Sequence, residues 1–118
     1  MKRVFVYGTL MQGERASSML KSGVYKGEYM LDGYATYDLG PFPAVKEEKG
    51  GKVIGELYEI PDILIERLDA YESEGSLYKR ASVSVKKGEI QEDDVYVYVY
   101  LGTVNGSRCI NGKWHSAY

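Results

Sequence analysis

Hydrophobic and polar residues alternate with the two-residue period of a β-strand in several stretches of the chain. The clearest stretch, residues 95–101, places valine and leucine on one face and Tyr96, Tyr98 and Tyr100 on the other. Strands are expected over residues 3–7, 24–31, 34–39, 44–46, 53–60, 78–85 and 95–101. Glycine and charged residues between these strands predict turns or loops at 32–33, 47–52 and 87–94.

A helical period replaces the alternation at residues 61–72. Pro61 suits the first position of a helix, and Asp62 suits the positive end of its dipole. The apolar positions expected to face the core are Ile63, Leu64, Leu68 and Tyr71. A shorter apolar stripe predicts a second helix within residues 14–20. About six strands and two or more short helices indicate an α+β fold, a small and mostly antiparallel β-barrel flanked by helices.

Length and charge narrow the classes of function. The 118 residues fit one domain spanning 1–118, and a formal net charge of −2 argues against nucleic-acid binding. No run is long and apolar enough for a membrane span, and the apolar start is broken at Tyr7-Gly8-Thr9, unlike a signal peptide. A single cysteine excludes an internal disulfide and favours the cytoplasm. Because the chain has only one cysteine and one histidine, a structural zinc site is improbable, and no metal or cofactor is expected.

The first candidate for chemistry is the segment Tyr7-Gly8-Thr9-Leu10, where the first expected strand ends. Consecutive backbone N–H groups after a strand-ending glycine can hold a carboxylate or a carbonyl oxygen. Thr9 would add a hydroxyl group. An ordinary turn between strand and loop is the alternative interpretation of the same residues.

The second candidate is Glu72, at the end of the expected helix. The negative end of the helix dipole disfavours the charged form of a carboxylate and raises its pKa. A free glutamate titrates near 4.3 and a useful base nearer ~6–7, so burial has to supply most of the shift. A solvated glutamate is the alternative. Asp69 is expected to point outward or to brace the helix end, and Glu74 to lie in solvent.

Further residues carry weaker signals. Phe42, in the stiff loop of residues 39–44, is expected either to wall a pocket or to tuck inward in a surface turn. The tyrosine face of residues 95–101 would stack nucleobases or, as the acidic chain favours, pack under a helix or line a cavity. Cys109 has no base in view and is a poor nucleophile candidate. His115 is expected to be a packed or exposed terminal residue.

These segments together resemble the gamma-glutamylcyclotransferase-like family over nearly the whole chain. The resemblance rests on Val4–Leu10, Asp38-Leu39-Gly40 with Phe42-Pro43-Ala44, Val53–Tyr58, Leu68–Glu72, Tyr78-Lys79-Arg80, Val97–Tyr100 and Asn111–Trp114. Many relatives have Glu-Gly where this chain has Glu72-Ser73. The pattern around Glu72 and Tyr78 looks more like the gamma-glutamylamine cyclotransferase branch, which releases an amine such as lysine.

The resemblance implies a small barrel with a pocket floored by the loop Tyr7–Leu10, and a catalytic glutamate at Glu72. The implied substrate is a gamma-glutamyl amine or a related gamma-glutamyl compound. Its α-amine would attack its own γ-carbonyl, giving 5-oxoproline and a free amine. In this hypothesis the N–H groups of Gly8, Thr9 and Leu10 bind the glutamyl carboxylate or the oxyanion, and Tyr78 orients Glu72 or the substrate.

Two other classes of function stay open at this point. One is a non-catalytic domain of the same fold that binds a small molecule without turning it over. The other is an interaction module that uses the tyrosine face of residues 95–101.

Overall fold

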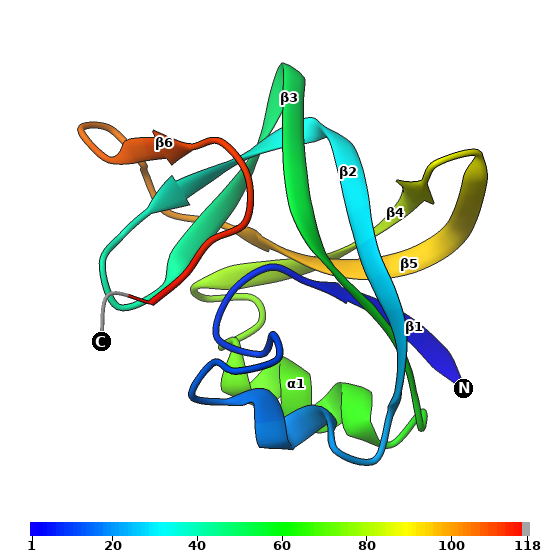
Figure 1. Ribbon diagram of the computed structural model, residues 1–118. Coiled ribbons are helices and arrows are strands. Elements are labelled where there is room, and N and C mark those ends of the chain that lie inside the picture. Colours follow the sequence, from blue (N-terminus) through cyan, green and yellow to red (C-terminus); the bar gives the residue numbers. More distant parts are fainter. Residues whose placement is uncertain (117–118) are drawn as a thin grey trace.

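The computed structural model describes residues 1–116 and is built around a closed five-stranded barrel (Figure 1). Its strands are β1 (Lys2–Val6), β2 (Val24–Asp38), β3 (Pro43–Ile60), β4 (Tyr78–Lys87) and β5 (Ile90–Tyr100). They pair in the order β3-β1-β5-β4-β2, and β2 pairs again with β3 to close the ring. Strand β6 (Arg108–Ile110) adds to the edge of β2. Within these pairs only β1 and β5 run parallel, so the expected mostly antiparallel barrel is confirmed.

The predicted breaks at 32–33 and 47–52 are wrong, because β2 and β3 run through them as long strands. Asp32 pairs with Lys52 and Tyr34 with Glu47, so the ladder resumes across an irregularity rather than ending there. Gly33 (φ +84°) takes the left-handed backbone conformation that this irregularity needs. The predicted polar loop of residues 87–94 is likewise a tight hairpin, since β5 begins at Ile90.

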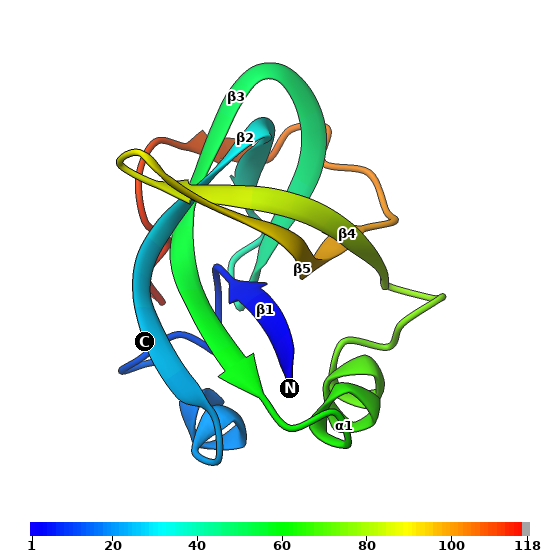
Figure 2. The same cartoon turned by 90° about the vertical axis from the view of Figure 1, so that its right-hand side faces the viewer.

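The two helices lie together at one end of the barrel (Figures 1 and 2). They are the 3₁₀ helix η1 (Ser17–Leu20) and the α-helix α1 (Leu64–Tyr71), both shorter than expected. Residues 61–63 form a turn before α1, with the Leu64 N–H bonded to the Pro61 carbonyl. Because Ile63 precedes the helix, its side chain is 76% exposed, and Ile65 is buried in its place.

Two apolar clusters form the core. One contains side chains from all five barrel strands, such as Phe5, Val53 and Val95, and fills the interior of the barrel. The other joins the outer face of the barrel wall to α1, η1 and Trp114 of the C-terminal segment. Tyr98 belongs to this second cluster, so the tyrosine face of β5 packs against the helices as expected. No helix in the described part of the chain is long and apolar enough to cross a membrane.

Candidate active site

The end of β1 and the end of α1 meet around one cavity. All six residues singled out from the sequence line it: Tyr7, Gly8, Thr9, Leu10, Glu72 and Tyr78. The remaining lining comes from Phe5, Val6, Phe42, Pro43 and Tyr98. Its empty volume is about 350 Å³, counted to include the open mouth. Residues more than sixty positions apart in the sequence are brought to one hollow because the end of β1 and the end of α1 pack in the same apolar cluster.

The loop after β1 lines this cavity and carries unpaired backbone donors. Within residues 1–116, no acceptor takes a hydrogen bond from the N–H groups of Gly8, Thr9 or Leu10. The loop is nevertheless fixed, since Met11 N–H donates to the Gly8 carbonyl at 3.0 Å and Ala16 N–H to the Thr9 carbonyl at 2.9 Å. Such a row of ordered, unpaired amides can bind a carboxylate or an oxyanion.

Glycine is required at the start of this loop by close packing. A β-carbon on Gly8 would lie 2.6 Å from Cγ of Pro43, well inside van der Waals contact. Pro43 begins β3 and also lines the cavity, so its ring presses on the backbone that carries the free amides. The absence of a side chain at Gly8 therefore lets the wall and the loop approach each other.

Glu72 is the half-buried acid of the cavity and caps the C-terminal end of α1. Burial raises the pKa of its carboxyl to about 7. No described side chain donates a hydrogen bond to the carboxylate or forms an ion pair with it. The acid is thus poised near neutral pH with its oxygens free for a ligand, the condition expected of a general base.

Two of the tyrosines that line the cavity, Tyr7 and Tyr78, are held by backbone carbonyls. The Tyr7 hydroxyl donates to the Tyr98 carbonyl, and the Tyr78 hydroxyl donates to the Pro43 carbonyl at 2.8 Å. Burial is the main cause that raises the pKa of both hydroxyls. For the pKa of Tyr78 the next cause is the negative charge of Glu72, and for that of Tyr7 it is Tyr78, followed by Glu72. Tyr78 makes no hydrogen bond to Glu72, so its hydroxyl fixes the cavity wall through Pro43.

The end of α1 is tied to the loop and to the barrel. Tyr71, which was expected to face the core, is 40% exposed, and its hydroxyl lies 2.7 Å from the Thr9 hydroxyl. Asp69 accepts hydrogen bonds from the Arg80 guanidinium of β4 and, at 2.7 Å, from the Tyr98 hydroxyl of β5. These contacts match the bracing role expected for Asp69 and fix the helix end that carries Glu72.

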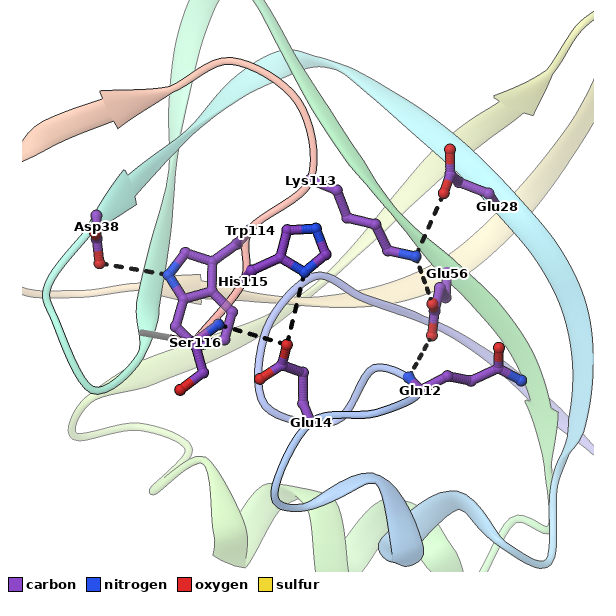
Figure 3. A network of polar contacts seen from close by, with 9 residues as sticks. All are labelled: Gln12, Glu14, Glu28, Asp38, Glu56, Lys113, Trp114, His115 and Ser116. Carbon is purple, nitrogen blue, oxygen red and sulfur yellow. Dashed lines mark hydrogen bonds and ion pairs between the residues drawn. The ribbon is translucent and has the colours of Figure 1, made fainter. Parts of the chain in front are cut away.

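A buried acid that the sequence analysis did not single out anchors the same loop from the other side (Figure 3). Glu56 of β3 is 1% exposed. Its carboxylate accepts hydrogen bonds from the Gln12 N–H at 2.9 Å and from Lys113 Nζ at 2.7 Å. Lys113 also forms an ion pair with Glu28 of β2 at 3.3 Å. An acid on the otherwise apolar strand face of Ile54, Tyr58 and Ile60 was the signal available in the sequence.

The other residues considered from the sequence lie elsewhere. Cys109 is exposed on β6, and the His115 side chain is 74% exposed. Phe42 does line the cavity, as one of its two interpretations expected. No group of His, Cys, Asp and Glu among the described residues is arranged to hold a metal ion.

A closed barrel whose strand-end loop and helix-end acid enclose one cavity is an arrangement suited to a small-molecule ligand. The chain belongs to the family described as gamma-glutamyl cyclotransferase, AIG2-like, whose model matches residues 4–116. It is 33% identical over 113 residues to the gamma-glutamylcyclotransferase family protein ytfP of Citrobacter rodentium, covering 95% of this chain and 94% of that protein.

Two further relatives have informative names. The gamma-glutamylaminecyclotransferase A of Danio rerio is 32% identical over 107 residues, covering 80% of this chain and 66% of that protein. The crystal structure of an AIG2-like protein from Mus musculus superposes with a TM-score of 0.74 at 25% identity, covering 86% of this chain and 78% of that chain. The family resemblance seen in the sequence is therefore confirmed.

Proposed function

We propose that the protein is a gamma-glutamyl cyclotransferase that converts a gamma-glutamyl amine, or a related gamma-glutamyl compound, into 5-oxoproline and a free amine. The observation that carries the proposal is a half-buried glutamate with a pKa raised to about 7, in the same cavity as three unpaired backbone N–H groups. Family membership and the name of the Danio rerio relative support the same chemistry.

The reaction begins with proton transfer. The Glu72 carboxylate takes a proton from the α-ammonium group of the substrate, which frees the nitrogen lone pair. A glutamate with a pKa of about 7 accepts that proton far more readily than one with an ordinary pKa.

Ring closure follows within one molecule. The α-nitrogen attacks the γ-carbonyl carbon, and the developing oxyanion or the substrate carboxylate is bound by the N–H groups of Gly8, Thr9 and Leu10. The Glu72 carboxyl gives its proton to the amide nitrogen as the bond between that nitrogen and the γ-carbon breaks. The Glu72 carboxylate then takes the second proton from the ring nitrogen, which leaves neutral 5-oxoproline, and passes it to the released amine. No water is consumed, so the main task of the cavity is to hold the glutamyl chain folded.

The test is incubation of the protein with γ-glutamyl-lysine, joined through the lysine side-chain amine, and measurement of 5-oxoproline. The wild-type protein should form 5-oxoproline, and Glu72→Gln should lower kcat by about 10²–10⁴-fold, the usual contribution of general acid–base catalysis. Glu66→Gln, an exposed acid in the first turn of the same helix, is the matched control and should keep the wild-type rate.

Two outcomes would contradict the proposal. Full activity in a folded Glu72→Gln variant would remove Glu72 from the reaction. Tight binding of γ-glutamyl compounds by the wild-type protein with no 5-oxoproline would favour the non-catalytic binding domain instead.

A further inference from the structure

A second hollow adjoins the active-site cavity on its open side. This vestibule shares four lining residues with the cavity, among them Thr9 and Glu72, and adds Arg15, Tyr71 and Leu77. Its empty volume is about 500 Å³, counted to include open solvent. The vestibule is therefore the continuation of the cavity beyond Glu72 and Thr9.

Arg15 is held in place by the loop that precedes it. The Ala16 N–H donates to the Thr9 carbonyl at 2.9 Å, which folds residue 15 back beside the free amides of the loop. Arg15 thus stands at the mouth because of the same backbone hydrogen bond that shapes the floor of the cavity.

The Arg15 guanidinium has no partner among the residues that the structure describes. The neighbouring acid, Glu14, is engaged elsewhere, because its carboxylate lies 3.9 Å from His115 Nδ1 and accepts the Ser116 N–H at 3.5 Å (Figure 3). Glu72, the acid of the vestibule lining, owes its raised pKa to burial, with no opposing effect from Arg15. The guanidinium is thus an unneutralised cation on the vestibule wall.

The order of groups in the substrate decides what reaches this cation. If the glutamyl end is bound by the N–H groups of the inner loop, Glu72 must lie beside the α-nitrogen and the departing amide nitrogen. Everything attached to the departing nitrogen then extends past Glu72 into the vestibule. A guanidinium offers paired N–H donors that fit a carboxylate.

We propose, resting on the function proposed above, that Arg15 binds a carboxylate carried by the leaving amine. Arg15 then determines how strongly the site favours a leaving amine that carries this carboxylate over one that lacks it.

The experiment compares substrates that differ only in that carboxylate. One pair is γ-glutamyl-lysine, joined through the side-chain amine, and γ-glutamyl-cadaverine. The other pair is γ-glutamyl-alanine and γ-glutamyl-ethylamine, in which the carboxylate stands close to the amide nitrogen. In at least one pair the wild-type kcat/KM should be about two- to fivefold higher for the carboxylate form, the range expected for an ion pair with an exposed arginine such as Arg15.

Arg15→Gln should abolish this preference by raising KM for the carboxylate substrate about two- to fivefold, with kcat unchanged. Its kcat/KM for the substrate without a carboxylate should stay at the wild-type value. Arg67→Gln is the matched control, because Arg67 is an exposed arginine that lines neither the cavity nor the vestibule.

The inference fails if the wild-type protein shows no preference in either pair, or if Arg15→Gln slows both members of a pair equally. Neither result touches the proposed function, because turnover itself would remain. If nothing is turned over, calorimetric binding of the same pairs to the wild-type protein and to Arg15→Gln still decides the point. Equal affinity of the two proteins for the carboxylate ligands would then overturn the inference.

Discussion

Glu72 lies at the end of α1 and is partly removed from water, and this burial makes its ionisation less favourable. Its pKa is raised to about 7, above the unfolded value near 4.5. Between these two values the folded state binds more protons than the unfolded state, so this residue lowers the free energy of unfolding as the pH rises. The penalty is absent below about pH 4.5 and complete above about pH 7.

Removal of the carboxyl group should therefore change stability in a pH-dependent way. We expect the free energy of unfolding of Glu72→Gln, relative to that of the wild-type protein, to increase by about 2–3 kcal/mol from pH 5 to pH 8. Urea unfolding of both proteins at the two pH values measures this difference, and all other titrating groups cancel. A stability difference that does not vary with pH would mean that Glu72 titrates as an exposed glutamate.

Ser73, the residue after Glu72, has an unusual backbone conformation. Ser73 has φ +51°, the left-handed conformation in which glycine is favoured, and its N–H donates to the Ala70 carbonyl at 3.2 Å. A glycine would adopt this conformation without the steric cost that a side chain brings. A serine in that conformation costs about 1 kcal/mol, and the closing hydrogen bond of the helix end offsets part of it.

At the scale of elements, the C-terminal segment stabilises the loop after β1 through the buried Glu56. Trp114 is 1% exposed in the cluster beneath the helices, and Lys113 places its charge on the buried Glu56 (Figure 3). Glu56 in turn accepts the Gln12 N–H, four residues after Gly8. Through Glu56, the C-terminal segment therefore orders the loop that carries the free amides, about a hundred residues earlier in the chain.

Removal of the Lys113 ammonium group should destabilise the protein, because the buried Glu56 carboxylate loses its neutralising charge. We expect Lys113→Met to lower the free energy of unfolding by about 1–3 kcal/mol, because a buried carboxylate is left with neutral donors. Lys49→Met, at an exposed lysine without an ion pair, is the control and should change stability by less than about 0.5 kcal/mol. Urea denaturation provides the measurement.

A second substitution separates this account from a general loss of packing. Glu56→Gln combined with Lys113→Met should recover part of the lost stability, since the uncompensated charge is gone. A double variant whose two effects simply add would show that Glu56 and Lys113 do not depend on each other.

At the scale of the whole molecule, closure of the barrel explains which strands and turns could be predicted from the sequence. The alternation of valine and tyrosine in β5 predicted both faces correctly, because one faces the barrel interior and the other the helices. The breaks predicted at 32–33 and 47–52 were wrong as strand ends, because the pairing of β2 with β3 skips Gly33 and residues 48–51 and then resumes. The pairing of distant residues overrides the local turn preferences there, and a short stretch of sequence does not reveal such pairing.

The candidate site divides in the same way. The cavity residues Tyr7–Leu10, Glu72 and Tyr78 were readable because each sits at the end of a regular element or in a segment typical of the family. Glu56 and Arg15 were not, since their importance depends on what the fold places beside them. Arg15 looks like any charged loop residue until the vestibule is known.

The central claim is that Glu72, in its free-base form, removes the proton that starts ring closure. The most direct measurement is the pH dependence of kcat/KM for 5-oxoproline formation from γ-glutamyl-lysine between pH 5 and pH 8. The value should rise about tenfold per pH unit at low pH and level off above a bend near 7, the pKa set by burial of Glu72. A profile that is flat across this range, as an acid titrating near 4.5 would give, would contradict the account.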